Sequence, residues 1–87
     1  MLYADPNLEA IESPMQANVW KVTAEEGQTL QSNQKITILE AMKMEIDVIV
    51  PDRLIGATLE RILIKPGDTV DSGQAVAIAR LSTKTSA

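Results

Sequence analysis

The chain has 87 residues, a net charge of −4, and neither cysteine nor histidine. This length allows one small domain, and the two missing residue types exclude disulfides, thiolate metal sites and imidazole acid–base chemistry. The acidic balance argues against nucleic acid as a partner. A membrane span needs about 18 consecutive apolar residues, which the chain lacks, and its start does not have the pattern of a secretory leader. We therefore expect a soluble cytoplasmic domain, away from membranes, with no catalytic residues and no metal of its own.

Residues 1–8 are expected to form a tether and residues 82–87 a tail around a domain of residues 9–81. Within that domain, β-branched residues, which favour strands, recur in five runs. The runs lie at Val19–Val22, Ile36–Ile38, Ile46–Val50, Ile62–Ile64 and Val76–Ile78. Gly27 and Gly67 lie between runs and supply the positive φ that a tight turn requires. Trp20 and the Ile, Val and Leu side chains of the strands are expected to form the core.

The sequence repeats itself at an offset of 40 residues. Residues 27–38 align with residues 67–78, and five of these twelve positions are identical. An internal repeat is a signal about the fold as a whole. Each half is predicted to run strand, turn, short strand, turn, strand. The two pseudo-symmetric halves are expected to pack as an all-β flattened barrel or sandwich. The second half has three more residues between Pro51 and its strand than the first half has after Pro14.

The two halves meet at Glu40–Glu45, which reads Glu-Ala-Met-Lys-Met-Glu. The segment from Leu39 consists of good helix formers, so a helix of two turns is an alternative. Such a helix would be shorter than the roughly 12–15 residues that an isolated helix needs in water, and strand-like runs flank it on both sides. A hairpin is therefore favoured, with Lys43 at its tip. The tip is expected at one end of the domain, and the termini with the Pro51–Ala57 connection at the other.

At this point the chain resembles the biotinyl domain, the biotin carboxyl carrier module of biotin-dependent carboxylases. The resemblance covers about Glu12–Arg80 and is carried by Ser13-Pro14-Met15, Ala41-Met42-Lys43-Met44, Val50-Pro51 and Lys65-Pro66-Gly67-Asp68. It implies a flattened β-barrel of two pseudo-symmetric halves with a lysine on a hairpin turn. That lysine falls on Lys43, where the resemblance implies an amide to biotin.

The resemblance also implies partners. A biotin protein ligase would attach the biotin and recognise Ala41, Met42 and Met44. The biotin would then carry a carboxyl group from a biotin carboxylase site, which uses ATP and bicarbonate, to a carboxyltransferase site. The domain itself would be a non-catalytic carrier and a monomer in isolation. The run Asn18–Val22 is similar to the carriers of urea carboxylases.

The chain departs from the family pattern in two places. Ala17 stands where the family usually has glycine, and the loop Asp52–Ala57 is longer than usual. The thumb loop of some bacterial acetyl-CoA carboxylase carriers is missing, because Trp20–Gly27 runs without an insertion.

Two other classes stay open. Lipoyl carriers of 2-oxo-acid dehydrogenases resemble this domain but usually carry aspartate at the position of Met42. Unmodified structural domains of efflux-pump adaptors share the half-repeat but interrupt it with a helical hairpin, which is not visible here. Glu40 and Glu45, beside the tip, fit either ligase contacts or solvated strand ends. They do not resemble a catalytic carboxylate pair, since no acid–base partner is evident.

Overall fold

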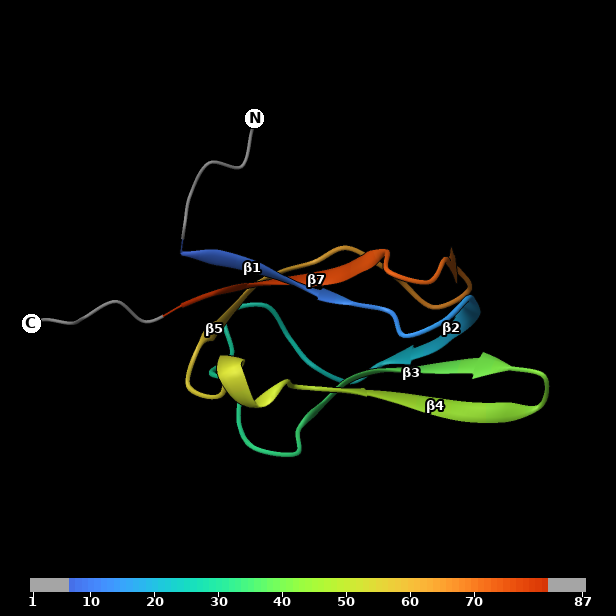
Figure 1. Cartoon of the computed structure of the whole chain (residues 1–87), viewed down its shortest axis with the longest axis horizontal. Coiled ribbons are helices and arrows are strands. Elements are labelled where there is room, and N and C mark those ends of the chain that lie inside the picture. Colours follow the sequence, from blue (N-terminus) through green and yellow to red (C-terminus); the bar gives the residue numbers. More distant parts are fainter. Residues whose placement is uncertain (1–6, 82–87) are drawn as a thin grey trace, which may run out of the picture.

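A computed structural model describes residues 7–81 and shows seven strands arranged around one core (Figure 1). The elements are β1 (Leu8–Glu12), β2 (Ala17–Val22), β3 (Lys35–Ala41), β4 (Met44–Ile49), the 3₁₀ turn η1 (Asp52–Leu54), β5 (Thr58–Ile62), β6 (Thr69–Val70) and β7 (Ala75–Arg80). Within this described part of the chain, no helix is long and apolar enough to cross a membrane.

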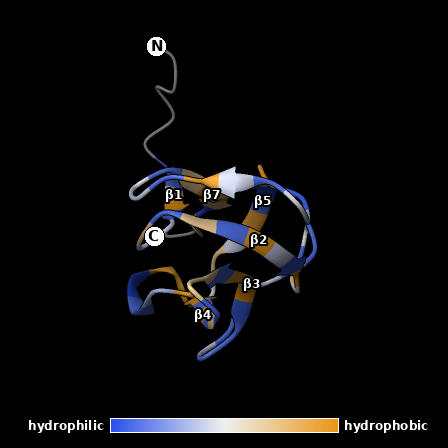
Figure 2. Cartoon of the chain, turned by 90° about the vertical axis from the view of Figure 1, so that its right-hand side faces the viewer, coloured by the Kyte–Doolittle hydropathy of each residue, from blue (hydrophilic) through white to orange (hydrophobic). Residues whose placement is uncertain are grey.

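The strands form two antiparallel sheets that pack face to face, as the end-on view in Figure 2 shows. One sheet has the order β1-β7-β5, and the other has the order β4-β3-β2-β6. The predicted all-β fold of two halves is confirmed. It is a sandwich, because the two sheets do not close into a barrel.

The two halves are joined by turns that cross between them. The Gly27 amide donates a hydrogen bond to the Leu59 carbonyl over 2.7 Å, and the Gly67 amide donates to the Val19 carbonyl over 2.9 Å. Both glycines have positive φ, 89° and 94°. The two bonds are equivalent at the offset of the repeat. The donors Gly27 and Gly67 are 40 residues apart, and so are the acceptors Val19 and Leu59. Each half thus adds its turn to the sheet of the other half, and the repeat seen in the sequence becomes a pseudo-twofold axis.

Aliphatic side chains from both sheets fill the core. The largest fully buried side chains are Leu30, Ile36, Leu39, Leu54, Leu59, Val70, Val76 and Thr37. Ile, Val and Leu residues supply all but one of this set, as expected. Ile49 is an exception and is 45% exposed, because it points outward from β4, the edge strand of its sheet.

The expectation that Trp20 belongs to the core is wrong, since Trp20 is 47% exposed. The cause is a β-bulge. Val19 and Lys21 pair with the consecutive residues Leu39 and Ile38, so Trp20 is the extra residue on β2. A bulge re-aims the side chains around it. Here it leaves the indole on the outer surface, with the Lys21 ammonium 4.7 Å from the ring centroid.

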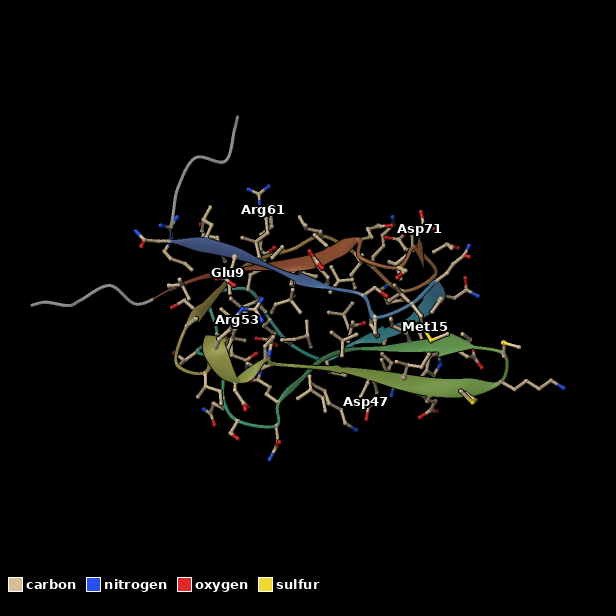
Figure 3. The ribbon with its side chains drawn as sticks, viewed as in Figure 1. Glu9, Met15, Asp47, Arg53, Arg61 and Asp71 are labelled. Carbon is tan, nitrogen blue, oxygen red and sulfur yellow. The ribbon has the colours of Figure 1, made fainter. Side chains whose placement is uncertain are left out.

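The connection between β4 and β5 forms η1, which closes one end of the sandwich. Leu54 of η1 is fully buried, and the Arg53 Nε lies 2.8 Å from the Glu9 Oε1 on β1. This pair links the 3₁₀ turn to the first strand, and both residues are labelled in Figure 3. The connection therefore covers the end of the core with an apolar side chain.

The folded unit begins slightly earlier than expected. Leu8 pairs with Arg80, and the Asn7 carbonyl accepts a hydrogen bond from the Leu81 amide over 2.7 Å. Asn7 and Leu8, which the sequence places in the tether, thus contact the end of β7 and the residue after it. The remaining tether and the tail at residues 82–87 lie outside the described residues.

The turn before β6 contains an acid-sensitive contact. The Asp68 carboxylate accepts hydrogen bonds from the Lys65 ammonium over 3.1 Å and from the Lys65 amide over 3.0 Å. These two bonds, the side-chain bond first, lower the pKa of Asp68 below its ordinary value. A carboxyl whose pKa is lowered by folding stabilises the fold above its unfolded pKa, and this contribution is lost as the pH falls through the folded pKa.

The first half holds the equivalent turn with a neutral group, since the Glu25 amide donates to the Gln28 Oε1 over 3.0 Å. Asp68→Gln is therefore expected to keep the turn and remove its dependence on acid. The urea midpoint of the variant should fall less steeply than that of the unsubstituted chain between about pH 5 and pH 3. Identical slopes for the two chains would contradict this account of Asp68.

Candidate functional site

The segment between β3 and β4 is a hairpin, as predicted, and the helical alternative is wrong. Ala41 pairs with Met44, which leaves Met42 and Lys43 as the two loop residues. Their φ angles are 53° and 67°. Two positive φ values in a two-residue loop define a type I′ turn, whose twist matches that of the strands it joins. Figure 1 shows this loop at one end of the domain, with η1, the start of β1 and the end of β7 at the other.

The turn is strained, because neither loop residue is glycine or asparagine. A left-handed conformation costs a residue with a side chain roughly 1–2 kcal/mol, and type I′ turns strongly prefer Asn-Gly. The surrounding structure holds the conformation, since β3 pairs on one side with β4 and on the other with β2. Strain of this kind tends to occur at functional sites.

The side chains around the tip are mostly exposed. Met42 is 88% exposed and Met44 is 57% exposed, and Lys43 is also exposed. Ala41 is partly buried and packs against the core. The structure thus brings the four predicted site residues together in one turn, with two thioethers in solvent beside the lysine and one small side chain beneath it.

Lys43 differs from the other lysines within residues 7–81. The Lys35 Nζ lies 3.4 Å from the Asp47 Oδ2, and the Lys65 Nζ lies 3.1 Å from the Asp68 Oδ1. Lys21 contacts an indole ring. In the same part of the chain, no carboxylate pairs with Lys43. An amide to a carboxylic cofactor requires a primary amine that another protein can reach, and Lys43 fits that requirement best.

Two glutamates lie next to the tip. Glu40 and Glu45 are cross-strand partners, and both are exposed. Like charges directly opposite each other destabilise a strand pair. Within residues 7–81, neither carboxylate is in an ion pair. The end of the domain that bears Lys43 is therefore acidic.

Met15 also lies at this end, although sequence reasoning gave it no role in the site. Asn18 pairs with Glu40, so the β1–β2 loop reaches the hairpin end, where Figure 3 shows Met15. The Ser13 hydroxyl, which is buried, donates to the Met15 carbonyl over 2.6 Å, and Met15 itself is 37% exposed. Its position depends on the register between β2 and β3, which the sequence does not state directly.

The remaining surface offers no comparable chemistry. Within residues 7–81, no group of three acidic, histidine or cysteine side chains could hold a metal ion. Two shallow grooves, of about 270 and 440 Å³, both border Arg53. Arg53 belongs to η1, and neither groove is lined by a residue of the Ala41–Met44 turn.

Known proteins resemble this chain in both sequence and structure. A family model described as "Biotin-requiring enzyme" matches residues 9–79. The chain is 43% identical over 79 residues to a putative urea carboxylase of Emericella nidulans, which covers 91% of this chain and 6% of that protein. It is 41% identical over 59 residues to a biotin/lipoyl attachment protein of Bacillus subtilis, which covers 68% of this chain and 77% of that protein.

Two solved structures are similar over nearly the whole chain. A single-chain, multi-domain long-chain acyl-CoA carboxylase matches with a TM-score of 0.81 and 25% identity, covering 95% of this chain and 8% of that one. The urea carboxylase of Kluyveromyces lactis matches with a TM-score of 0.76 and 30% identity, covering 91% of this chain and 7% of that one. The chain thus spans less than a tenth of the length of these carboxylases.

A small β-sandwich with an exposed lysine on a two-residue turn fits a carrier domain for a covalently attached group. The chain belongs to the biotin-requiring enzyme family, and within it to the biotin carboxyl carrier domains. The resemblance read from the sequence is confirmed.

The strain in the turn leads to a testable prediction about stability. Lys43→Gly removes the steric penalty of a positive φ, although glycine loses about 0.5–1 kcal/mol through its greater backbone freedom. We expect a net gain of about 0.5–1 kcal/mol in the free energy of unfolding, measured in urea. Lys35→Gly, within β3, is the control and should lose stability. A loss of stability in Lys43→Gly would contradict the account of strain.

Proposed function

We propose that Lys43 carries biotin through an amide bond and that the domain moves a carboxyl group between two active sites of a biotin-dependent carboxylase. The observation that carries this proposal is the lysine itself, exposed on a type I′ turn of a biotinyl-family domain. When bound, biotin supplies the ureido nitrogen that takes up the carboxyl group. The role of this domain is to hold the attachment point, Lys43, and to bring it to each active site.

The attachment chemistry needs little from the domain beyond access. A ligase would present biotin as an acyl-adenylate, the Lys43 amine would attack its carbonyl carbon, and AMP would leave as the amine loses a proton to the ligase site. Because the hairpin is already ordered, presenting Lys43 costs little conformational entropy. The exposed thioethers of Met42 and Met44 provide adaptable apolar contacts, and the small Ala41 lets a partner approach closely. These three residues are the proposed recognition set for a biotin protein ligase.

The same features suit a carrier that visits separate active sites. A lysine side chain on a rigid tip is a flexible tether, and a tether raises the effective concentration of its cargo at each site that it can reach. Carboxylation of biotin with ATP and bicarbonate, and transfer to an acceptor, would take place on a biotin carboxylase and a carboxyltransferase. The domain itself would catalyse neither step. We propose that it works as a monomeric unit within a larger cytoplasmic assembly.

The proposed parent enzyme is a urea carboxylase. The support is the 43% identity to the putative urea carboxylase of Emericella nidulans and the structural match to the Kluyveromyces lactis enzyme. Of the two solved structures, the urea carboxylase is 30% identical to this chain and the long-chain acyl-CoA carboxylase 25%.

The attachment residue is tested by co-expressing the chain with a biotin ligase and measuring intact mass, followed by peptide mapping. We expect one biotin, on Lys43. Lys43→Arg should fold normally and carry none, since a guanidinium cannot form this amide, whereas Lys35→Arg should be labelled fully. Biotin on another lysine would refute the site. Incorporation of lipoate by a lipoate ligase, without biotin, would replace this function with that of a lipoyl carrier.

Met42→Asp tests the recognition set. The change replaces an exposed apolar contact with a charge and creates the residue that lipoyl carriers usually have. We expect the biotin ligase rate to fall about tenfold or more, which corresponds to the loss of roughly 1.4 kcal/mol of recognition. Ile55→Asp is the control, because Ile55 is also an exposed apolar residue but lies next to η1. Equal rates for Met42→Asp and the unsubstituted chain would mean that the ligase does not contact Met42.

A further inference from the structure

The outer face of the four-stranded sheet carries an exposed tryptophan close to the carrier lysine. Two rows of cross-strand partners define this face. The row nearer the tip is Asn18, Glu40 and Glu45, and the next row is Lys21, Ile38 and Asp47. Trp20 lies at the bulge between these rows on β2. Between Trp20 and the hairpin tip lie only the row that contains Glu40 and the Ala41–Met44 pair.

The two halves of the molecule show that the fold does not require an aromatic residue at this place. The counterpart of Trp20, 40 residues on, is Glu60, which occupies the equivalent bulge between Leu59 and Arg61 on β5. Glu60 lies in an ion pair, with its Oε1 3.0 Å from the Arg80 Nε. A charged residue thus satisfies the same backbone geometry. The fold therefore does not require the exposed indole of the first half.

Two contacts lie next to the indole, one with the backbone beside it and one with the ring. The Thr37 hydroxyl, fully buried, donates to the Lys21 carbonyl over 2.6 Å, which fixes the backbone just after the bulge. The Lys21 ammonium lies 4.7 Å from the ring centroid. A large side chain that is ordered in the free protein loses little entropy on binding. Tryptophan is enriched among the residues that dominate binding energy at protein interfaces.

The charge around Trp20 indicates what kind of surface would fit. Glu40 and Glu45 lie between it and Lys43, exposed and like-charged across the strands. Asp47 is already neutralised by Lys35, 3.4 Å away. The side toward the tip is therefore acidic. Its complement is a protein surface with an apolar pocket for the indole and lysines or arginines at the rim.

We propose that this face, centred on Trp20 with Glu40 and Glu45 at its margin, docks on the biotin carboxylase domain that loads the carrier. The inference rests on the proposed function of Lys43. A domain that admits the arm of Lys43 must approach this end of the molecule. A site that binds ATP and bicarbonate handles two anions and so must offer positive charge, which matches the acidic margin. The indole anchors the carrier while its arm occupies the site.

The test uses the biotinylated chain as a substrate for its cognate biotin carboxylase domain, with bicarbonate-dependent ATP cleavage as the readout. Trp20→Glu installs the residue that the second half tolerates at the same bulge. We expect the KM for the carrier to rise about tenfold, while kcat changes less than twofold. Ile55→Glu removes a similarly exposed apolar side chain, 45% exposed, beside η1 and should leave the KM unchanged. Free biotin serves as a substrate that needs no docking.

Three outcomes would overturn the docking surface: an unchanged KM for Trp20→Glu, an equal rise for Ile55→Glu, or a loss confined to kcat. The proposed function is tested separately. If the unsubstituted chain carries no biotin on Lys43, the proposed function is refuted before any KM is measured. A biotinylated chain whose KM is insensitive to Trp20 refutes the docking surface alone.

A second measurement needs no substitution. Trp20 is the only tryptophan in the chain, so incorporation of 5-fluorotryptophan gives one ¹⁹F resonance. Addition of the unlabelled biotin carboxylase domain should shift or broaden this resonance, and added salt should reverse the change as the charges are screened. A resonance that stays unchanged while the carrier is being carboxylated would contradict the proposal. This result does not depend on whether Trp20→Glu folds.

Discussion

The exchange of glycine turns between the two halves is the constraint on which the rest of the domain depends. The amides of Gly27 and Gly67 each bond to a strand of the opposite half, so neither half completes its own sheet. The fully buried Leu30 and Val70 follow these turns and enter the common core with them. A half on its own would leave both a sheet edge and its share of the core uncovered, and the two halves are therefore expected to unfold together.

The site inherits its rigidity from this exchange. The short strand β6, which belongs to the second half, pairs with β2, and β2 in turn supports β3. Only Met42 and Lys43 connect β3 to β4, and both have a positive φ, which their side chains disfavour. The hairpin can tolerate this strain, and the like charges that Glu40 and Glu45 place opposite each other, because β3 is paired along its length with β4 on one side and with β2 on the other. Glycine at the second position of the turn would relieve the strain there but would remove the lysine.

Much of this was readable in the sequence. The repeat predicted the pseudo-symmetric fold, and the position of Lys43 between two strand-like runs predicted the hairpin. The outward position of Trp20 could not be read, because a bulge changes the direction of one side chain without altering the β-branched pattern around it. Nor was η1 predicted, since a three-residue 3₁₀ turn has no periodicity of its own. Its buried Leu54 would have been the signal, as an apolar residue inside a polar loop.

The placement of the chain ends has a mechanical consequence. The polypeptide enters at Leu8 and leaves at Arg80, which pair with each other at the end of the domain opposite the hairpin (Figure 1). A neighbouring domain joined through either Leu8 or Arg80 would therefore attach at the far end of the sandwich from Lys43. Rotation about such a joint would then move Lys43 farther than it moves residues near β1 and β7.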